Sequence, residues 1–128
     1  MTEQAAKLVH VSNLYRNEPQ GRLAAALARY CGPGRAIFCN SGAEANEAAI
    51  KLASRYAHGK YGEDRFEIIT MKNSFHGRTL AGISATGQEK VKKGFEPMVA
   101  GFRHVPFNDL EAVRQALSPA TVAILIEG

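Results

Sequence analysis

Short apolar segments alternate along this chain with segments whose apolar residues repeat at helical spacing. The clearest apolar segments are FEIITM at residues 66–71 and TVAILI at residues 121–126, and further strands are expected at residues 35–40, which contain a short apolar run, and at residues 103–106. Apolar strands that alternate with helices are typical of a parallel sheet. We therefore predict an α/β fold, with a mainly parallel sheet flanked by helices and with residues 121–126 buried on both faces of the sheet.

Helical spacing predicts where the flanking helices lie. We expect a short helix near the start of the chain and further helices at residues 19–30, 42–58, 80–86 and 109–117, the last with Asp109 as its N-cap. The helix at residues 42–58 is expected to have its apolar side at Ala45, Ala49, Leu52, Ala53 and Tyr56.

Composition indicates a soluble globular domain and excludes several classes of function. Hydrophobic residues make up 45% and charged residues 22% of the 128 residues. The net charge of +4 is spread along the chain without interleaved aromatic residues that stack on bases, so we do not expect nucleic-acid binding. The longest apolar run, at residues 122–126, is too short to span a membrane. The N-terminus does not resemble a signal peptide, so we expect a cytoplasmic protein.

The two cysteines, Cys31 and Cys39, lack the CxxC spacing of a zinc or redox site. Cys39 lies in the strand expected at residues 35–40. We interpret both cysteines as small core residues in a reducing compartment, and no metal site is predicted.

The segment NSGAEANEAAIKLA, residues 40–53, passes from the end of an expected strand into a helix. Gly42 and Ala43 have almost no side chain, so an anion can approach the unpaired N–H groups at this helix start. Ser41 and Glu44 also match a capping box, in which the two side chains satisfy such N–H groups themselves. The residues alone leave both interpretations open, a phosphate cradle and a capped helix start.

The loop NSFHGRT, residues 73–79, follows the strand expected at residues 66–71. The Phe75 ring can stack on a planar ligand, Arg78 can hold a carboxylate, and His76 can act as an acid, a base or a stacking group. Each also has a structural explanation, as a core ring, a solvated cation and a histidine that bonds backbone groups. Because this loop and the helix start both follow strands, we expect one sheet edge to carry them, which favours a binding site.

These segments, taken in order, resemble the class-III aminotransferases, most closely those of the acetylornithine and ornithine type. The resemblance is carried by SGAEANEAAIKLA, NSFHGRT, SATGQEK and GFEPMVAGF, and the earlier HVSNLY and NEPQGRLA fit the same family. It extends over essentially all 128 residues. The resemblance implies part of the fold-type-I large domain, a mainly parallel sheet that carries pyridoxal phosphate at its carboxyl edge.

The resemblance also assigns cofactor-binding roles to particular residues. Ser41, Gly42 and Ala43 are expected at the phosphate of pyridoxal phosphate, the last two through their backbone N–H groups. Phe75 is expected to stack on the pyridine ring. His76 is placed among the cofactor-binding residues without a role in proton transfer.

The resemblance assigns Arg78 to a substrate carboxylate. Glu127 resembles the first acidic residue of the E-P/G-x-Q-G-E segment of the family, with a less direct role. The implied reaction moves an amino group from N-acetylornithine, or an ornithine-like amine, to 2-oxoglutarate in arginine biosynthesis. A homodimer is implied for the complete protein.

Two groups that the family's chemistry needs are not matched in these residues. Transamination uses a lysine that holds the cofactor covalently and returns the proton, and an aspartate at the pyridine nitrogen. No lysine of this chain matches the catalytic position. We therefore expect residues 1–128 to be a partial cofactor-binding large domain, without the N-terminal segment, the half that carries the catalytic lysine and the small C-terminal domain. The isolated chain is expected to be inactive.

Two alternatives remain open from the sequence. The first is another class-III enzyme, such as a 4-aminobutyrate or succinylornithine aminotransferase or a glutamate-semialdehyde aminomutase. The second is a truncated protein without catalysis that binds a partner subunit, since an incomplete sheet leaves strand edges exposed.

Overall fold

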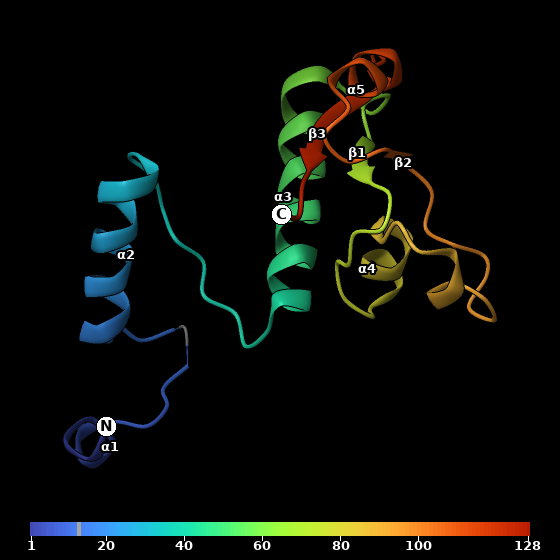
Figure 1. Cartoon of the computed structure of the whole chain (residues 1–128). Coiled ribbons are helices and arrows are strands. Elements are labelled where there is room, and N and C mark those ends of the chain that lie inside the picture. The colour runs from blue at the N-terminus through green and yellow to red at the C-terminus, as the bar shows by residue number, and fades with distance from the viewer. Residues whose placement is uncertain (13) are drawn as a thin grey trace. The chain divides into compact units, whose positions relative to one another are not determined.

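A computed structural model describes residues 1–12 and 14–128. These residues form two compact units, Met1–Phe38 and Cys39–Gly128, which Figure 1 shows coloured along the chain. All of the site residues predicted from the sequence lie in the second unit.

The first unit contains two helices, α1 (Thr2–Lys7) and α2 (Glu18–Cys31), in agreement with the helical spacing. The Asn17 side chain begins α2 by accepting a hydrogen bond from the N–H of Gln20 at 2.9 Å. The prediction of a strand at residues 35–40 is wrong, because this segment has no strand partner in the described part of the chain. Ile37 is exposed, as are Cys31 and Cys39, so the prediction of core cysteines is also wrong.

The second unit is built on a parallel sheet of three strands, β1 (Glu67–Met71), β2 (Phe102–Val105) and β3 (Thr121–Leu125). Their order is β2-β1-β3, and both pairings are parallel, as predicted. The central strand β1 is paired on both edges and is almost wholly buried. This sheet confirms the predicted α/β class.

The third strand differs from its prediction. Residues 121–126 are wholly apolar in sequence except for Thr121, yet Ile124 is 44% exposed. The physical reason is position: β3 is an edge strand of the described sheet, paired only with β1, although α3 lies against it. An apolar run therefore did not distinguish a strand covered on both faces from one that is covered in part.

Helices of the second unit follow the predicted order. They are α3 (Gly42–Tyr61), α4 (Leu80–Ala85) and α5 (Leu110–Ala116), with a short 3-10 turn, η1 (Glu89–Val91), between α4 and β2. Helix α3 continues three residues beyond its predicted end and stops before Gly62, where the backbone turns to a φ of 95°. Asp109 caps α5 as predicted, since its carboxylate accepts a hydrogen bond from the N–H of Ala112 at 2.9 Å.

The buried side of α3 is not the apolar side that the spacing predicted. Leu52 is 61% exposed and Tyr56 is exposed as well. The less exposed side carries Asn46, Ile50 and Ala57. Alanines occur on both sides of this helix, so the apolar pattern did not decide which side packs inward.

The core of the second unit is small and lies between the sheet and α5. Ile69, Met71 and Val105 form its buried centre, and Ala112, Val113 and Ala116 of α5 pack against it. No helix in residues 1–12 or 14–128 combines the length and apolar character needed to cross a membrane. The loop that carries several of the predicted site residues begins after the carboxyl end of β1.

Candidate functional site

Three segments meet at the carboxyl edge of the sheet. The chain leaves β1 into the loop at residues 73–79, and it leaves β3 at residues 126–128. Because β1 and β3 are adjacent and parallel, their carboxyl ends lie at the same edge. The third segment is the N-terminus of α3.

The start of α3 is capped and still presents free N–H groups. Ser41 Oγ accepts a hydrogen bond from the N–H of Glu44 at 3.2 Å. The Glu44 carboxylate accepts from the N–H of Asn40 at 2.8 Å and not from that of Ser41, so the reciprocal half of a capping box is displaced by one residue. Within the described residues no acceptor meets the N–H groups of Gly42 and Ala43. Capping and anion binding are therefore compatible here.

The loop after β1 packs directly on the start of α3. Gly77 has a φ of 106°, and a Cβ built on it would lie 2.8 Å from the Cβ of Ala43. One helical turn further along, Asn46 Nδ2 donates a hydrogen bond to the carbonyl of His76 at 3.0 Å. The structure thus brings together the two segments that the sequence singled out separately.

Glu127 connects the end of β3 to the same loop. Its Oε2 accepts a hydrogen bond from the backbone N–H of Phe75 at 2.6 Å. The Phe75 side chain is 44% exposed, so its ring is available to stack on a ligand. Glu127 thus contacts the same loop that packs on the start of α3.

His76 is buried, with 3% of its surface exposed. Its backbone N–H donates to Thr86 Oγ1 at 2.9 Å, and its ring Nε2 has no hydrogen-bond partner within the described residues. Burial lowers the pKa of His76, and the nearby His104 lowers it further, whereas the charge of Glu127 opposes the shift. The imidazole is therefore neutral at pH 7.

Arg78 lies at the far end of the loop and is exposed. It forms no ion pair with any described residue. A cavity of about 450 Å³ adjoins it, lined by Arg78, Leu80, Ile83, Lys90, Val91 and Phe95. The guanidinium is thus available to a carboxylate beside an apolar surface.

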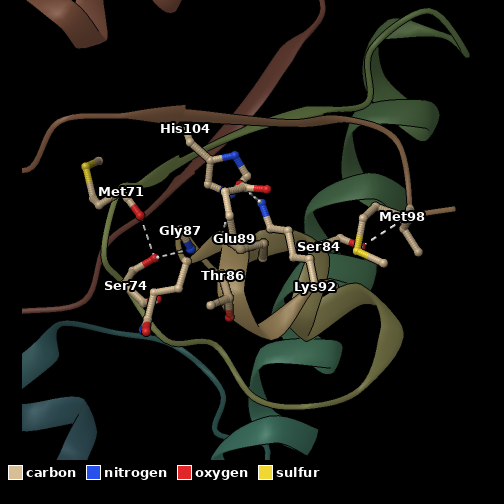
Figure 2. Close-up of polar contacts among 12 residues, drawn as sticks. Met71, Ser74, Ser84, Thr86, Gly87, Glu89, Lys92, Met98 and His104 are labelled. Atoms are coloured by element: carbon tan, nitrogen blue, oxygen red, sulfur yellow. Dashed lines mark hydrogen bonds and ion pairs between the residues drawn. The ribbon is translucent and has the colours of Figure 1, made fainter. Parts of the chain in front are cut away.

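Sequence reasoning missed the residues that hold this loop, some of which are shown in Figure 2. Ser74 Oγ donates to the carbonyl of Met71 at 2.6 Å and accepts from the N–H of Gly87 at 3.3 Å. Gln88 Nε2 donates to the carbonyl of Ser74 at 3.1 Å. A Cβ on Gly87 would lie 2.1 Å from the Met71 oxygen, so only glycine fits. Their segment, SATGQEK, contributed to the resemblance, but no spacing in it indicated these contacts.

A second group of polar contacts in Figure 2 lies within the η1 turn and between β2 and α4. Lys92, whose side chain is almost buried, pairs with Glu89 at 2.8 Å. His104 Nε2 lies 3.1 Å from the carbonyl oxygen of Ala85. The pKa of His104 is lowered chiefly by burial, with a further contribution from Lys92. The contact between His104 and Ala85 connects β2 to the end of α4, directly before Thr86.

The arrangement has the parts needed to bind a phosphorylated, planar ligand and a carboxylate. Two unpaired N–H groups at a helix start bind a phosphate. An exposed aromatic ring on the adjacent loop stacks on a planar group. The guanidinium of Arg78, which has no ion-pair partner among the described residues, has the geometry that pairs with a carboxylate.

Relatives of this chain are found over its whole length. It is 56% identical over 124 residues to the acetylornithine aminotransferase of Myxococcus xanthus, with 97% of this chain and 31% of that protein covered. It is 51% identical over 127 residues to the succinylornithine transaminase/acetylornithine aminotransferase of Pseudomonas aeruginosa, with 99% and 31% covered. The chain thus spans about a third of the length of these relatives.

Solved structures resemble the fold in the same way. The ornithine aminotransferase of Toxoplasma gondii matches with a TM-score of 0.88 at 27% identity, covering 98% of this chain and 30% of that one. The family model described as aminotransferase class-III matches residues 1–128. The chain therefore belongs to the class-III aminotransferases.

Proposed function

We propose that the protein to which these residues belong is a pyridoxal-phosphate-dependent aminotransferase that moves an amino group from N-acetylornithine to 2-oxoglutarate, in arginine biosynthesis. Family membership and the names of the most similar relatives support the reaction type and the amino donor. The observation that carries the proposal is the contact of Gly77 with Ala43, which puts the free helix start beside the Phe75 loop.

The residues present fit pyridoxal phosphate. Gly42 and Ala43 offer two N–H groups without acceptors among the described residues, and apart from the adjacent residues and the backbone of α3 no described atom lies within 4 Å of where a Cβ of Gly42 would be. A phosphate can therefore approach this backbone closely. Phe75 exposes an aromatic face on the neighbouring loop. The N–H groups suit the phosphate dianion of the cofactor, and the aromatic face suits its planar ring.

In the proposed site the helix start holds the phosphate through Gly42 and Ala43, with Ser41 adjacent. Phe75 orients the pyridine ring, and the buried His76 belongs to the cofactor-binding residues without a role in proton transfer. When bound, pyridoxal phosphate supplies the electron sink for the carbon that loses its proton. The residues of this chain bind and orient it.

Arg78 is proposed to bind a substrate carboxylate, because its guanidinium is exposed and has no ion-pair partner in the described part of the chain. The apolar lining beside it, formed by Leu80, Ile83, Val91 and Phe95, adjoins the methylenes of a bound substrate. This arrangement suits an amino acid or an oxo acid with a terminal carboxylate.

We propose that residues 1–128 are part of the cofactor-binding large domain. The catalytic lysine and the aspartate at the pyridine nitrogen then come from other parts of the protein, and the isolated chain is inactive. A cytoplasmic homodimer completes the proposal, as the family resemblance implies.

A close second candidate is a succinylornithine aminotransferase, or an enzyme that uses both donors. The relative from Pseudomonas aeruginosa is named for both activities and is 51% identical to this chain. The two donors differ only in the acyl group on the α-amino nitrogen, away from the terminal amine that is transferred, so the cofactor site described above serves either.

The test uses the longest open reading frame that contains these residues, expressed and purified free of host transaminases. We expect turnover with N-acetylornithine and 2-oxoglutarate that depends on added pyridoxal phosphate, and none from the chain of residues 1–128 alone. Succinylornithine and 4-aminobutyrate are the comparison donors. No turnover with any of the three donors would contradict the proposal, and preference for succinylornithine would establish the second candidate.

A further inference from the structure

We propose that Glu127 and Thr86 are positioning residues that hold two consecutive backbone amides, those of Phe75 and His76, and thereby set the ring of Phe75 against the cofactor. The inference rests on the proposed function. It assigns a role to Thr86, which the sequence did not single out, and a specific one to Glu127.

Glu127 holds the first amide. Its carboxylate accepts the N–H of Phe75 at 2.6 Å across 52 residues of sequence. A hydrogen bond to an ionised carboxylate is stronger than one between neutral groups. Because Glu127 directly follows the β3 region and Phe75 follows β1, this bond fixes the loop to the neighbouring strand end.

Thr86 holds the second amide. Its side chain is fully buried, and Oγ1 accepts the N–H of His76 at 2.9 Å while donating its own proton to the carbonyl of Gly82 at 2.8 Å. A hydroxyl has a single proton, so the bond to Gly82 leaves a lone pair for His76. The end of α4 therefore determines where the His76 amide lies.

The next groups along the loop are fixed as well. The carbonyl of His76 accepts from Asn46 Nδ2 at 3.0 Å, and Gly77 lies against Ala43. The N–H of Phe75, the N–H of His76 and the carbonyl of His76 are all held by side chains of other segments. The backbone on both sides of the Phe75 Cα is thus held in one conformation.

Packing covers the Phe75 ring only in part, since 44% of the residue's surface is exposed. Its direction then follows from the backbone that carries it and from a small number of rotamers. The side chains of Glu127 and Thr86 therefore do more than stabilise the loop, because the loss of either one moves the Phe75 ring that stacks on the cofactor.

The experiment compares Thr86→Val, which keeps the shape and removes the acceptor, with Thr86→Ser, which keeps the acceptor. Glu127→Ala and Glu127→Gln form a second pair at an exposed position, where folding is not at risk. Each variant is made in the longest open reading frame that contains these residues. Amide hydrogen exchange at Phe75 and His76 is measured without cofactor, and the dissociation constant and visible circular dichroism of bound pyridoxal phosphate are measured with it.

We expect Thr86→Val and Glu127→Ala to accelerate hydrogen exchange at these two amides. We also expect both variants to lower the affinity for pyridoxal phosphate about tenfold and to change the circular dichroism of the bound cofactor. Thr86→Ser is expected to restore all three. Faster exchange with unchanged affinity and dichroism would overturn the proposal, as would unchanged exchange. A wild-type protein that binds no pyridoxal phosphate would instead overturn the proposed function, and the exchange rates would still decide whether the two side chains hold the amides.

Discussion

Gly77 lies so close to Ala43 that a Cβ added to the glycine would be 2.8 Å from the alanine Cβ and 3.1 Å from its Cα. Real Cβ atoms do not approach other carbons this closely, so the contact requires glycine. It joins the loop after β1 to the first turn of α3. The proposed cofactor site depends on this approach, because the loop carries Phe75 and the first turn carries the free N–H groups.

Gly77→Ala should therefore damage the site as well as the fold. We expect a loss of about 1–3 kcal/mol in the free energy of unfolding from the positive φ alone, and a further loss of affinity for pyridoxal phosphate because the loop must move away from Ala43. Gly62→Ala is the matched control: Gly62 has a φ of 95°, but nothing lies within 4 Å of its Cβ position. Equal effects of the two variants on cofactor affinity would contradict the assigned contact.

Ser41→Ala removes the N-cap of α3. Its Oγ accepts from the N–H of Glu44, so we expect a loss of about 1 kcal/mol in the free energy of unfolding, measured by urea denaturation. Asp109→Ala removes the corresponding cap of α5 and should cost a similar amount. Of the two variants, only Ser41→Ala should lower the affinity for pyridoxal phosphate. If Asp109→Ala weakened it as much, general destabilisation would explain the effect.

Acid should destabilise the second unit through His76, which is buried, and His104, which is partly buried. The pKa values of His76 and His104 are lowered in the folded state by burial, so below about pH 6.5 the unfolded chain binds more protons than the folded one. The free energy of unfolding should then be fully retained above about pH 6.5 and fall as the pH is lowered towards the folded-state pKa values. Each histidine contributes at most about 1.4 kcal/mol per pH unit.

Urea denaturation at a series of pH values checks this expectation. His76→Gln and His104→Gln should each reduce the slope of stability against pH between about pH 5 and 6.5, and the double variant should reduce it most. A slope that neither substitution changes would show that other groups govern the acid response.

Arg78→Ala should raise the KM for the carboxylate substrate at least about tenfold while the affinity for pyridoxal phosphate stays unchanged. Arg78→Lys should restore little of the loss, because an ammonium cannot pair with a carboxylate in bidentate geometry. Lys90 lines the same cavity, so Lys90→Ala is the matched control and should have the smaller effect on KM. A larger effect at Lys90 would transfer the carboxylate-binding role to that residue.

Much of the fold could be predicted from local patterns, since a parallel strand buried at the centre of a sheet is mainly apolar, as β1 is apart from Glu67 and Thr70. The failures arose where burial depends on what the segment packs against. Residues 36–39 are apolar but have no strand partner in the described chain, and Leu52 lies on an apolar stripe of α3 that is exposed. Hydrophobic spacing records the preference for burial and not the partner that provides it.

The candidate site could be predicted as two segments but not as one arrangement. The small residues at Gly42 and Ala43 and the loop with Phe75 and Arg78 were visible in the sequence. The bond from Phe75 to Glu127 spans 52 residues, and no local pattern encodes such a contact. Thr86 was missed for the same reason: a threonine at a helix end normally suggests only a turn.

The most direct test of the central claim compares Gly42→Pro with Gly42→Ala in the longest open reading frame that contains these residues. Gly42 is the first residue of α3 and follows the extended Ser41, where proline fits and removes only the N–H, whereas alanine retains it. Affinities for pyridoxal phosphate and for pyridoxal, which lacks the phosphate, are measured for both variants. We predict that the affinity for pyridoxal phosphate is about tenfold lower in Gly42→Pro than in Gly42→Ala, and that the affinity for pyridoxal is the same in both variants. Equal affinities of the two variants for pyridoxal phosphate would contradict a phosphate site at the start of α3.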